Sequence, residues 1–92
     1  MNLGKEIEIK CKNGDVHRIH SFNIFFIEIV NRDKRIFYLS KPSNNVDRIE
    51  SYGRISNSGL IFEAFGLEAD DYIQIHRRYI VPKLRVIGRG VK

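Results

Sequence analysis

Apolar and charged residues alternate with a period of two near the start of the chain. From residue 6 to residue 11 the odd positions are Ile, Ile and Cys and the even positions are Glu, Glu and Lys. This alternation predicts a strand whose buried face includes the thiol of Cys11. Asn13-Gly14 follows and favours a two-residue type I′ turn. Because such a turn would place Arg18 opposite Ile9 on the core face, we expect a β-bulge in the return strand.

A second hairpin is predicted further along the chain. Residues 24–30, Ile-Phe-Phe-Ile-Glu-Ile-Val, are rich in β-branched and aromatic side chains and predict a buried strand. A polar turn over residues 31–34 connects this strand to another over residues 35–39. The basic tip of this hairpin is expected to consist of Arg32, Lys34 and Arg35.

One segment has a helical pattern. Residues 41–45 predict a loop and residues 46–50 a short polar strand, and the helix is expected over residues 56–65. Ser56 or Ser58 is the expected N-cap, and Gly66 is expected to end the helix. Its predicted apolar face consists of Ile55, Leu60, Ile61, Ala64 and Phe65. Short strands at close spacing with a single helix predict a mainly β fold, a small antiparallel β domain.

The segment from Ile73 to Pro82 combines an apolar strand pattern with a basic cluster, His-Arg-Arg-Tyr, at residues 76–79. We expect a strand that buries its apolar side chains, namely Ile73, Ile75, Ile80 and Val81. Arg77 and Arg78 are then a fixed pair of guanidinium groups able to grip an anion. His76 is expected to be buried, neutral and hydrogen-bonded to a backbone carbonyl or a hydroxyl, which is a structural role.

Composition narrows the class of partner. A chain of 92 residues supports one small domain, and its net charge of +5 and pI of about 9.6 suggest a polyanionic partner. Nucleic acid is the first candidate, an anionic membrane surface the second, and a basic domain without such a partner the third. A single cysteine excludes an internal disulfide. With no signal-peptide pattern and no membrane-spanning run, we expect a cytoplasmic protein.

The sequence provides little support for catalysis. His17 and His20 are three residues apart on a predicted strand and point to opposite faces, which is poor geometry for a metal. Gly88-Arg-Gly90 lacks the Lys-Ser/Thr and the helix of a phosphate-binding loop. We therefore expect no enzyme activity, no catalytic residue, no metal and no cofactor.

Several motifs, in order along residues 6–87, resemble the LytTR family of DNA-binding output domains of response regulators. Ile-His-Arg-Arg-Tyr-Ile-Val at residues 75–81 is similar to the family's Ile-His-Arg-Ser-Tyr-Ile-Val signature. Residues 23–28, Asn-Ile-Phe-Phe-Ile-Glu, are similar to its Asp-Ile-x-Tyr-Ile-Glu strand. Phe37-Tyr38 and residues 52–55 resemble its next strand and its helix entry.

The resemblance implies a β-dominated fold with one short helix and a role as a transcription regulator. Loops at one edge would enter successive major grooves of double-stranded promoter DNA with repeated sites, and no membrane would be involved. The implied contacts fall on Lys34, with Arg35 and Arg32 beside it in the same tip. A further contact falls on Arg77, and Arg78 stands where the family often has Ser.

Some features depart from the family pattern and leave a second function open. The family's final hairpin and its receiver domain have no match in residues 1–92, and Pro82 replaces the usual Asn. The chain is expected to be a single LytTR-like domain without that hairpin. As an alternative to DNA binding, a protein-interaction module would pair with a full-length LytTR-type regulator through the sheet edge that the missing hairpin leaves unpaired. A homodimer is a further expected assembly.

Overall fold

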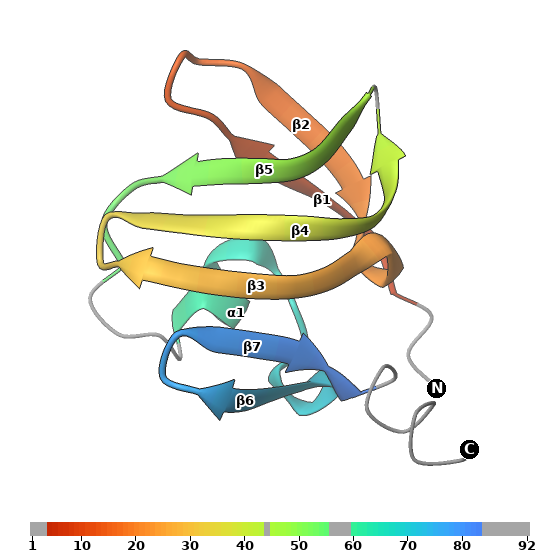
Figure 1. Cartoon of the computed structure of the whole chain (residues 1–92), viewed down its shortest axis with the longest axis vertical. Coiled ribbons are helices and arrows are strands. Elements are labelled where there is room, and N and C mark those ends of the chain that lie inside the picture. Colours follow the sequence, from red (N-terminus) through yellow and green to blue (C-terminus); the bar gives the residue numbers. More distant parts are fainter. Residues whose placement is uncertain (1–3, 44, 56–59, 84–92) are drawn as a thin grey trace.

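The computed structural model describes residues 4–43, 45–55 and 60–83. Figure 1 shows two antiparallel sheets with one short helix, which confirms the mainly β fold predicted from the sequence. The elements in chain order are β1 (Glu6–Lys10), β2 (Val16–His20), the 3-10 turn η1 (Ser21–Asn23), β3 (Ile24–Asn31), β4 (Lys34–Ser43), β5 (Val46–Tyr52), α1 (Leu60–Phe65), the 3-10 turn η2 (Ala69–Asp71), β6 (Tyr72–His76) and β7 (Tyr79–Pro82).

The larger sheet has five strands in the order β5-β4-β3-β7-β6. The β1–β2 hairpin and α1 lie behind this sheet in Figure 1, with the hairpin toward β5 and the helix behind β3. Buried apolar side chains fill the space between these layers. Those that are fully buried are Ile9, Ile24, Ile27, Phe37, Ile61 and Ile80.

Strand β3 is the centre of the five-stranded sheet, as its apolar composition predicts. It pairs with β4 on one side and β7 on the other. Ile24 and Ile27 are completely buried, whereas Phe25 is half exposed. The ladder with β4 is irregular at two places, between Ile24 and Phe26 and again between Ile29 and Asn31. The second irregularity lies just before the β3–β4 turn.

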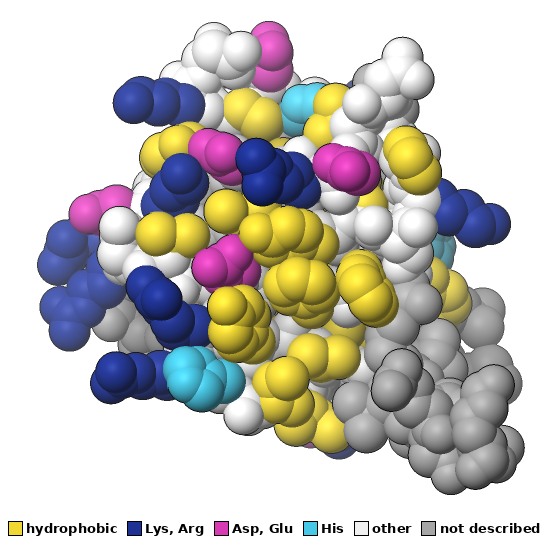
Figure 2. Space-filling model, viewed as in Figure 1, with side chains coloured by type: hydrophobic (Ala, Val, Ile, Leu, Met, Phe, Trp, Pro, Cys, Tyr) yellow, Lys and Arg dark blue, Asp and Glu magenta, His cyan; other side chains and the backbone are white. Residues whose placement is uncertain are grey.

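The outer face of this sheet carries aromatic side chains from three neighbouring strands. Phe26 stacks on Tyr38 with 4.3 Å between ring centroids, and Tyr79 meets Phe26 edge-on at 6.0 Å. The Tyr38 hydroxyl donates a hydrogen bond of 2.8 Å to a carboxylate oxygen of Glu28. Figure 2 shows hydrophobic side chains gathered over the middle of the sheet. The rings cover one another in part, and all three are only partly exposed.

The first hairpin differs from the expected one. A connection over residues 11–15 replaces the two-residue turn, and the Asn13 side chain accepts a hydrogen bond from the Asp15 amide at 3.1 Å. Gly14 has a positive φ of 91°, but Asn13 does not have a positive φ. The register therefore shifts by one residue, and Arg18 pairs with Glu8 on the solvent side. No bulge is needed in this ladder, so that expectation was wrong.

Two further boundaries differ from the prediction. Lys41, Pro42 and Ser43 belong to β4 rather than to a loop, and β5 continues to Tyr52. The turn between these strands contains Asn45, whose φ is 65°. Asn tolerates this left-handed conformation better than most residues, so the chain can reverse within very few residues.

The helix prediction is confirmed over its second half. The described helix begins at Leu60, and Ser56, Ser58 and Gly59 lie outside the described residues. Gly66 ends it with a φ of 69°, as expected. The amide of Gly66 bonds to the Glu63 carbonyl and the amide of Leu67 to the Phe62 carbonyl, which is the Schellman pattern.

Two residues assigned to the apolar face of the helix are exposed, so that part of the prediction was wrong. Leu60 is 44% exposed and Ala64 is also exposed. Ile61 is buried, and Phe65 packs against the core four residues later. Because residues four apart share a face of a helix, the pair of Ile61 and Phe65 fixes which side turns inward.

Candidate nucleic-acid interface

Two basic turns lie at the same end of the five-stranded sheet. Antiparallel pairing places the β6–β7 turn beside the β3–β4 turn, with Glu28 opposite Tyr79. The amide of Ile29 donates a hydrogen bond of 2.6 Å to the carbonyl of Arg78 and closes the ladder at that end. Figure 1 shows both turns on its left, and Figure 2 shows Lys and Arg side chains along the same edge. The turns, together with the adjoining residues 53–54, are called the basic end below.

The basic cluster in residues 73–82 is a hairpin turn, not part of a continuous strand. Arg77 and Arg78 form the turn between β6 and β7, and both are exposed. Ile80 is buried as expected, but Ile73 is 37% exposed and Ile75 61% exposed. The expectation that these two would be buried was wrong because β6 lies at the edge of the sheet.

His76 supports this turn from the surface. Its Nδ1 accepts a hydrogen bond of 3.2 Å from the Arg78 amide, and the Gln74 side chain donates one of 3.2 Å to the Arg77 carbonyl. The imidazole is exposed, so the expectation of burial was wrong. We expected a carbonyl or a hydroxyl as the hydrogen-bond partner of His76, but the partner is the backbone amide of Arg78. A structural role for His76 thus fits the geometry, as the acceptor that orders residues 77–78.

The β3–β4 turn is held by the chain that follows β5. The Asn31 side chain accepts a bond of 2.7 Å from the Asp33 amide. The amide of Gly53 bonds to the Asp33 carbonyl at 3.0 Å, and that of Ile55 bonds to the Arg32 carbonyl at 2.7 Å. These bonds fix the backbone of Arg32 while its side chain stays exposed.

Arg54 is a cation of the basic end that the sequence analysis missed. It lies beside the β3–β4 turn, and its guanidinium is 3.6 Å from a carboxylate oxygen of Asp33. Both side chains are about two-thirds exposed, so this ion pair is weak. Arg54 is close to the turn because β5 is antiparallel to β4, and Tyr52 pairs with Lys34. The position of Arg54 follows from the order of the strands in the sheet and not from the residues around it in the sequence.

Lys34 lies at the root of the turn and is already paired. Its ammonium is 3.2 Å from a Glu50 carboxylate oxygen and 5.4 Å from the centre of the Tyr52 ring. The hydrogen bonds to Glu50 and then Tyr52 raise the pKa of Lys34, and the reciprocal bonds from Tyr52 and Lys34 lower the pKa of Glu50. A phosphate group approaching Lys34 therefore competes with a resident carboxylate.

Arg35 is not at the exposed tip, so that expectation was wrong. It is only 3% exposed and pairs across the sheet with Ser51, which is 2% exposed. Its guanidinium donates to the hydroxyl of Ser51, to the carbonyl of Gly53 and to the carbonyl of Arg32. Burial lowers the pKa of Arg35. The missed signal was the alternation along β4, which puts Arg35 on the same face as Phe37.

A cavity of about 530 Å³ lies between the two turns. Its polar lining comes from both of them and from the buried guanidinium, and its apolar lining comes from three isoleucines. The lining residues are Ile29, Asn31, Arg32, Arg35, Ile55, Ile61 and Arg77. Three of the five predicted contact residues thus meet at one cavity. Lys34 and Arg78 do not line it.

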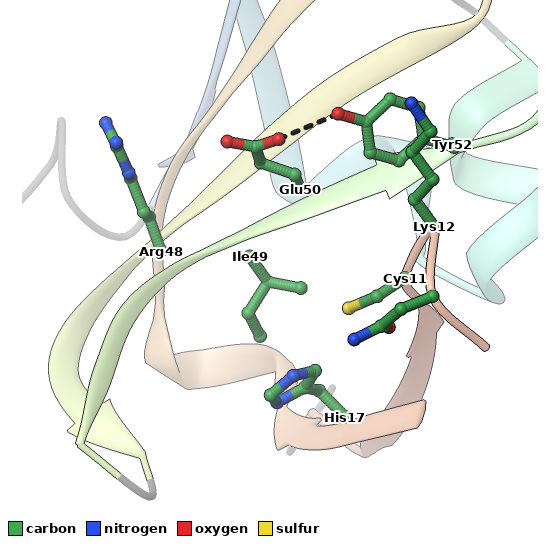
Figure 3. A pocket seen from close by; sticks show the side chains of 8 residues that line it. Cys11, Lys12, His17, Arg48, Ile49, Glu50 and Tyr52 are labelled. Atoms are coloured by element: carbon green, nitrogen blue, oxygen red, sulfur yellow. Dashed lines mark hydrogen bonds between the residues drawn. The ribbon is translucent and has the colours of Figure 1, made fainter. Parts of the chain in front are cut away.

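A second, more open groove of about 400 Å³ contains the cysteine. Cys11 and His17 of the first hairpin lie opposite Ile49 and Glu50 of β5, and Tyr52 donates a hydrogen bond to Glu50 (Figure 3). Burial, followed by the nearby carboxylates, raises the pKa of Cys11. The raised pKa disfavours the thiolate form of Cys11. Within residues 4–43, 45–55 and 60–83, no three His, Cys, Asp or Glu side chains are placed to hold a metal.

Comparison of the chain with protein-family models, with curated proteins and with solved structures finds no match. The resemblance to the LytTR family therefore remains a prediction. None of the helices in the described part of the chain is long and apolar enough to cross a membrane.

Proposed function

We propose that this chain is a sequence-specific DNA-binding domain of a transcription regulator. The observation that carries the proposal is the meeting of two basic turns, from separate hairpins, at one end of the sheet. Arg32, Arg77 and Arg78 are all exposed there. Two adjacent protruding turns present cations to phosphates on both sides of a groove, and Arg side chains at their tips have the reach to read guanine edges.

The five predicted contact residues take different roles in this proposal. Arg32 and Arg77 project from the turns and are the candidates for base or phosphate contacts. Arg78 adds charge beside them. Lys34 would contact a phosphate at the margin in exchange for its Glu50 partner, and the buried Arg35 holds the β3–β4 turn in shape.

The test is a mobility-shift titration with DNA from the region upstream of the chain's own gene, repeated at several salt concentrations. Phosphate contacts release counterions, so affinity should fall linearly with salt on logarithmic axes, by about 0.9 units of slope per phosphate. The matched control is Lys41→Gln, which removes one exposed charge at the opposite end of β4. Equal affinity for unrelated DNA would contradict sequence-specific binding.

The edge of the sheet supports a second candidate function, a module that pairs with a full-length LytTR-type regulator. Among the described strands, β6 has a neighbour on one side only, and Ile73 and Ile75 are exposed on it. An exposed edge strand with apolar side chains is a template for β-augmentation. Size measurements of the chain alone and mixed with such a regulator test for a homodimer and for this pairing. Ile75→Lys should abolish either assembly.

A further inference from the structure

Arg35 is a buried cation, and its hydrogen-bond partners among the described residues include no carboxylate. It is 3% exposed, and no Asp or Glu in the described part of the chain lies within ion-pair distance of it. Its hydrogen-bond acceptors are a hydroxyl and two carbonyls, all of them neutral. Asp33 partly opposes the effect of burial on the pKa of Arg35, but it forms no ion pair with the guanidinium. A buried charge that is only partly offset attracts an anion more strongly than an exposed one does, since water does not screen it.

Among the described residues that line the cavity beside Arg35, none is acidic. Arg32 and Arg77 contribute two further guanidinium groups, one from each turn. Ile29, Ile55 and Ile61 supply an apolar surface next to these charges, and Asn31 adds an amide. A guanidinium forms paired hydrogen bonds with a carboxylate or a phosphate, while the isoleucines suit a hydrocarbon group.

We propose that this cavity binds a small organic anion, with its carboxylate or phosphate head between Arg35, Arg32 and Arg77 and its apolar body against the isoleucines. The volume of about 530 Å³ lies within the usual range for small-molecule sites. A bare phosphate ion would leave the apolar wall empty, and a neutral hydrocarbon would leave three cations without a partner. The cavity therefore favours an anion that carries an apolar group.

A regulatory consequence of this site rests on the proposed DNA binding. Arg32 and Arg77 line the cavity and are also the side chains offered to DNA, so an occupied cavity withdraws both from the duplex. The small anion and DNA then compete for the same protein. Anion binding itself requires no DNA, so its test is independent of the proposed function.

The experiment uses the full chain with isoleucine methyl groups observed by NMR. Phenyl phosphate is the amphipathic anion, inorganic phosphate the bare head group and benzyl alcohol the neutral body. We expect phenyl phosphate to shift the methyl signals of Ile29, Ile55 and Ile61, and to leave that of Ile7 in β1 unchanged. Inorganic phosphate should bind at least about tenfold more weakly, and benzyl alcohol should cause no shift.

Variants separate the cavity from general attraction to a basic protein. Arg35→Lys keeps the charge but loses the planar guanidinium that the Ser51, Arg32 and Gly53 oxygens hold in place, so it should weaken phenyl phosphate binding by about tenfold. Arg77→Gln and Arg32→Gln alter exposed turns, and each should weaken binding by about threefold to tenfold. Lys41→Gln should change nothing. The proposal would be overturned if Lys41→Gln weakened binding as much as Arg77→Gln, or if phenyl phosphate shifted none of the three isoleucine signals. Both outcomes can be measured even if Arg35→Lys fails to fold.

Discussion

The guanidinium of Arg35 donates a hydrogen bond to the carbonyl oxygen of Gly53, 18 residues further along the chain. This bond joins the beginning of β4 to the chain that leaves β5. It lies under the β3–β4 turn, whose outer side carries Arg32. One buried cation thus shapes the surface on which the exposed cations are displayed.

Replacing Arg35 with Met should therefore destabilise the fold. The Ser51 hydroxyl loses its donor in a buried place and the Gly53 carbonyl loses its donor in a partly buried one, which costs about 1–3 kcal/mol in the free energy of unfolding. Urea denaturation followed by circular dichroism measures the change. Arg35→Lys should recover part of the loss, and Lys41→Gln should have no effect. Unchanged stability of Arg35→Met would show that the guanidinium is dispensable to the turn.

Arg77→Ala and Lys34→Ala should weaken DNA binding to different extents. A base contact by Arg77 is worth about 1–3 kcal/mol, while a phosphate contact is worth less. Lys34 is paired with Glu50, so its removal should have the smaller effect, mainly on the salt dependence. Mobility shifts on a cognate fragment give both values. If neither substitution changes the affinity of a folded protein, the contact assignment is wrong.

His76→Ala should lower the melting temperature modestly. The Arg78 amide loses its acceptor, but water can replace it at this exposed position, so we expect about 0.5–1.5 kcal/mol. His76→Asn should restore part of the stability, because Asn side chains accept bonds from nearby backbone amides in turns. If His76→Ala melts like the wild type yet binds DNA poorly, the imidazole is a contact residue and not a turn support.

Alkaline pH should destabilise the fold through Tyr72. Burial, with a smaller effect of Asp71, raises the pKa of Tyr72 from 10.0 to about 12. The fold favours the neutral phenol, so this stability is complete below pH 10 and is lost as the pH rises toward 12. A pKa difference of about two corresponds to about 2–3 kcal/mol. Thermal melts of the wild type and of Tyr72→Phe between about pH 9 and 12 should diverge, with the Tyr72→Phe variant retaining more stability. Parallel pH profiles would contradict the assignment to this residue.

The sequence predicted those elements that depend on a pattern among neighbouring residues. Alternation defined β1, an apolar run defined the central strand β3, and Gly66 marked the end of the helix. The register of the first hairpin was not predictable in this way, since the Asn13 side chain selects a longer connection than the pair Asn13-Gly14 suggests. The burial of Arg35 follows from alternation with Phe37, but the charge of the residue favoured an exposed interpretation.

The site was predicted as separate pieces and not as one arrangement. Arg32 and Arg77 were identified from local charge, but nothing local shows that they line one cavity. Their proximity results from the pairing of β3 with β7, two strands far apart in the sequence. Arg77-Arg78 also lacks the Gly, Asn or Pro that usually signals a turn, so residues 73–82 were interpreted as one strand.

That pairing of β3 with β7 also determines the dynamics of the basic end. The β6–β7 hairpin is joined to the rest of the sheet by a short ladder, Ile27 with Ile80 and Glu28 with Tyr79. Opening this ladder alone separates Arg77 from Arg32 while β3, β4 and β5 remain folded. Any ligand that needs both turns then binds with an affinity scaled by the fraction of molecules in which the ladder is closed. Substitutions at the buried Ile80 can therefore tune binding from a distance, without touching a single charge.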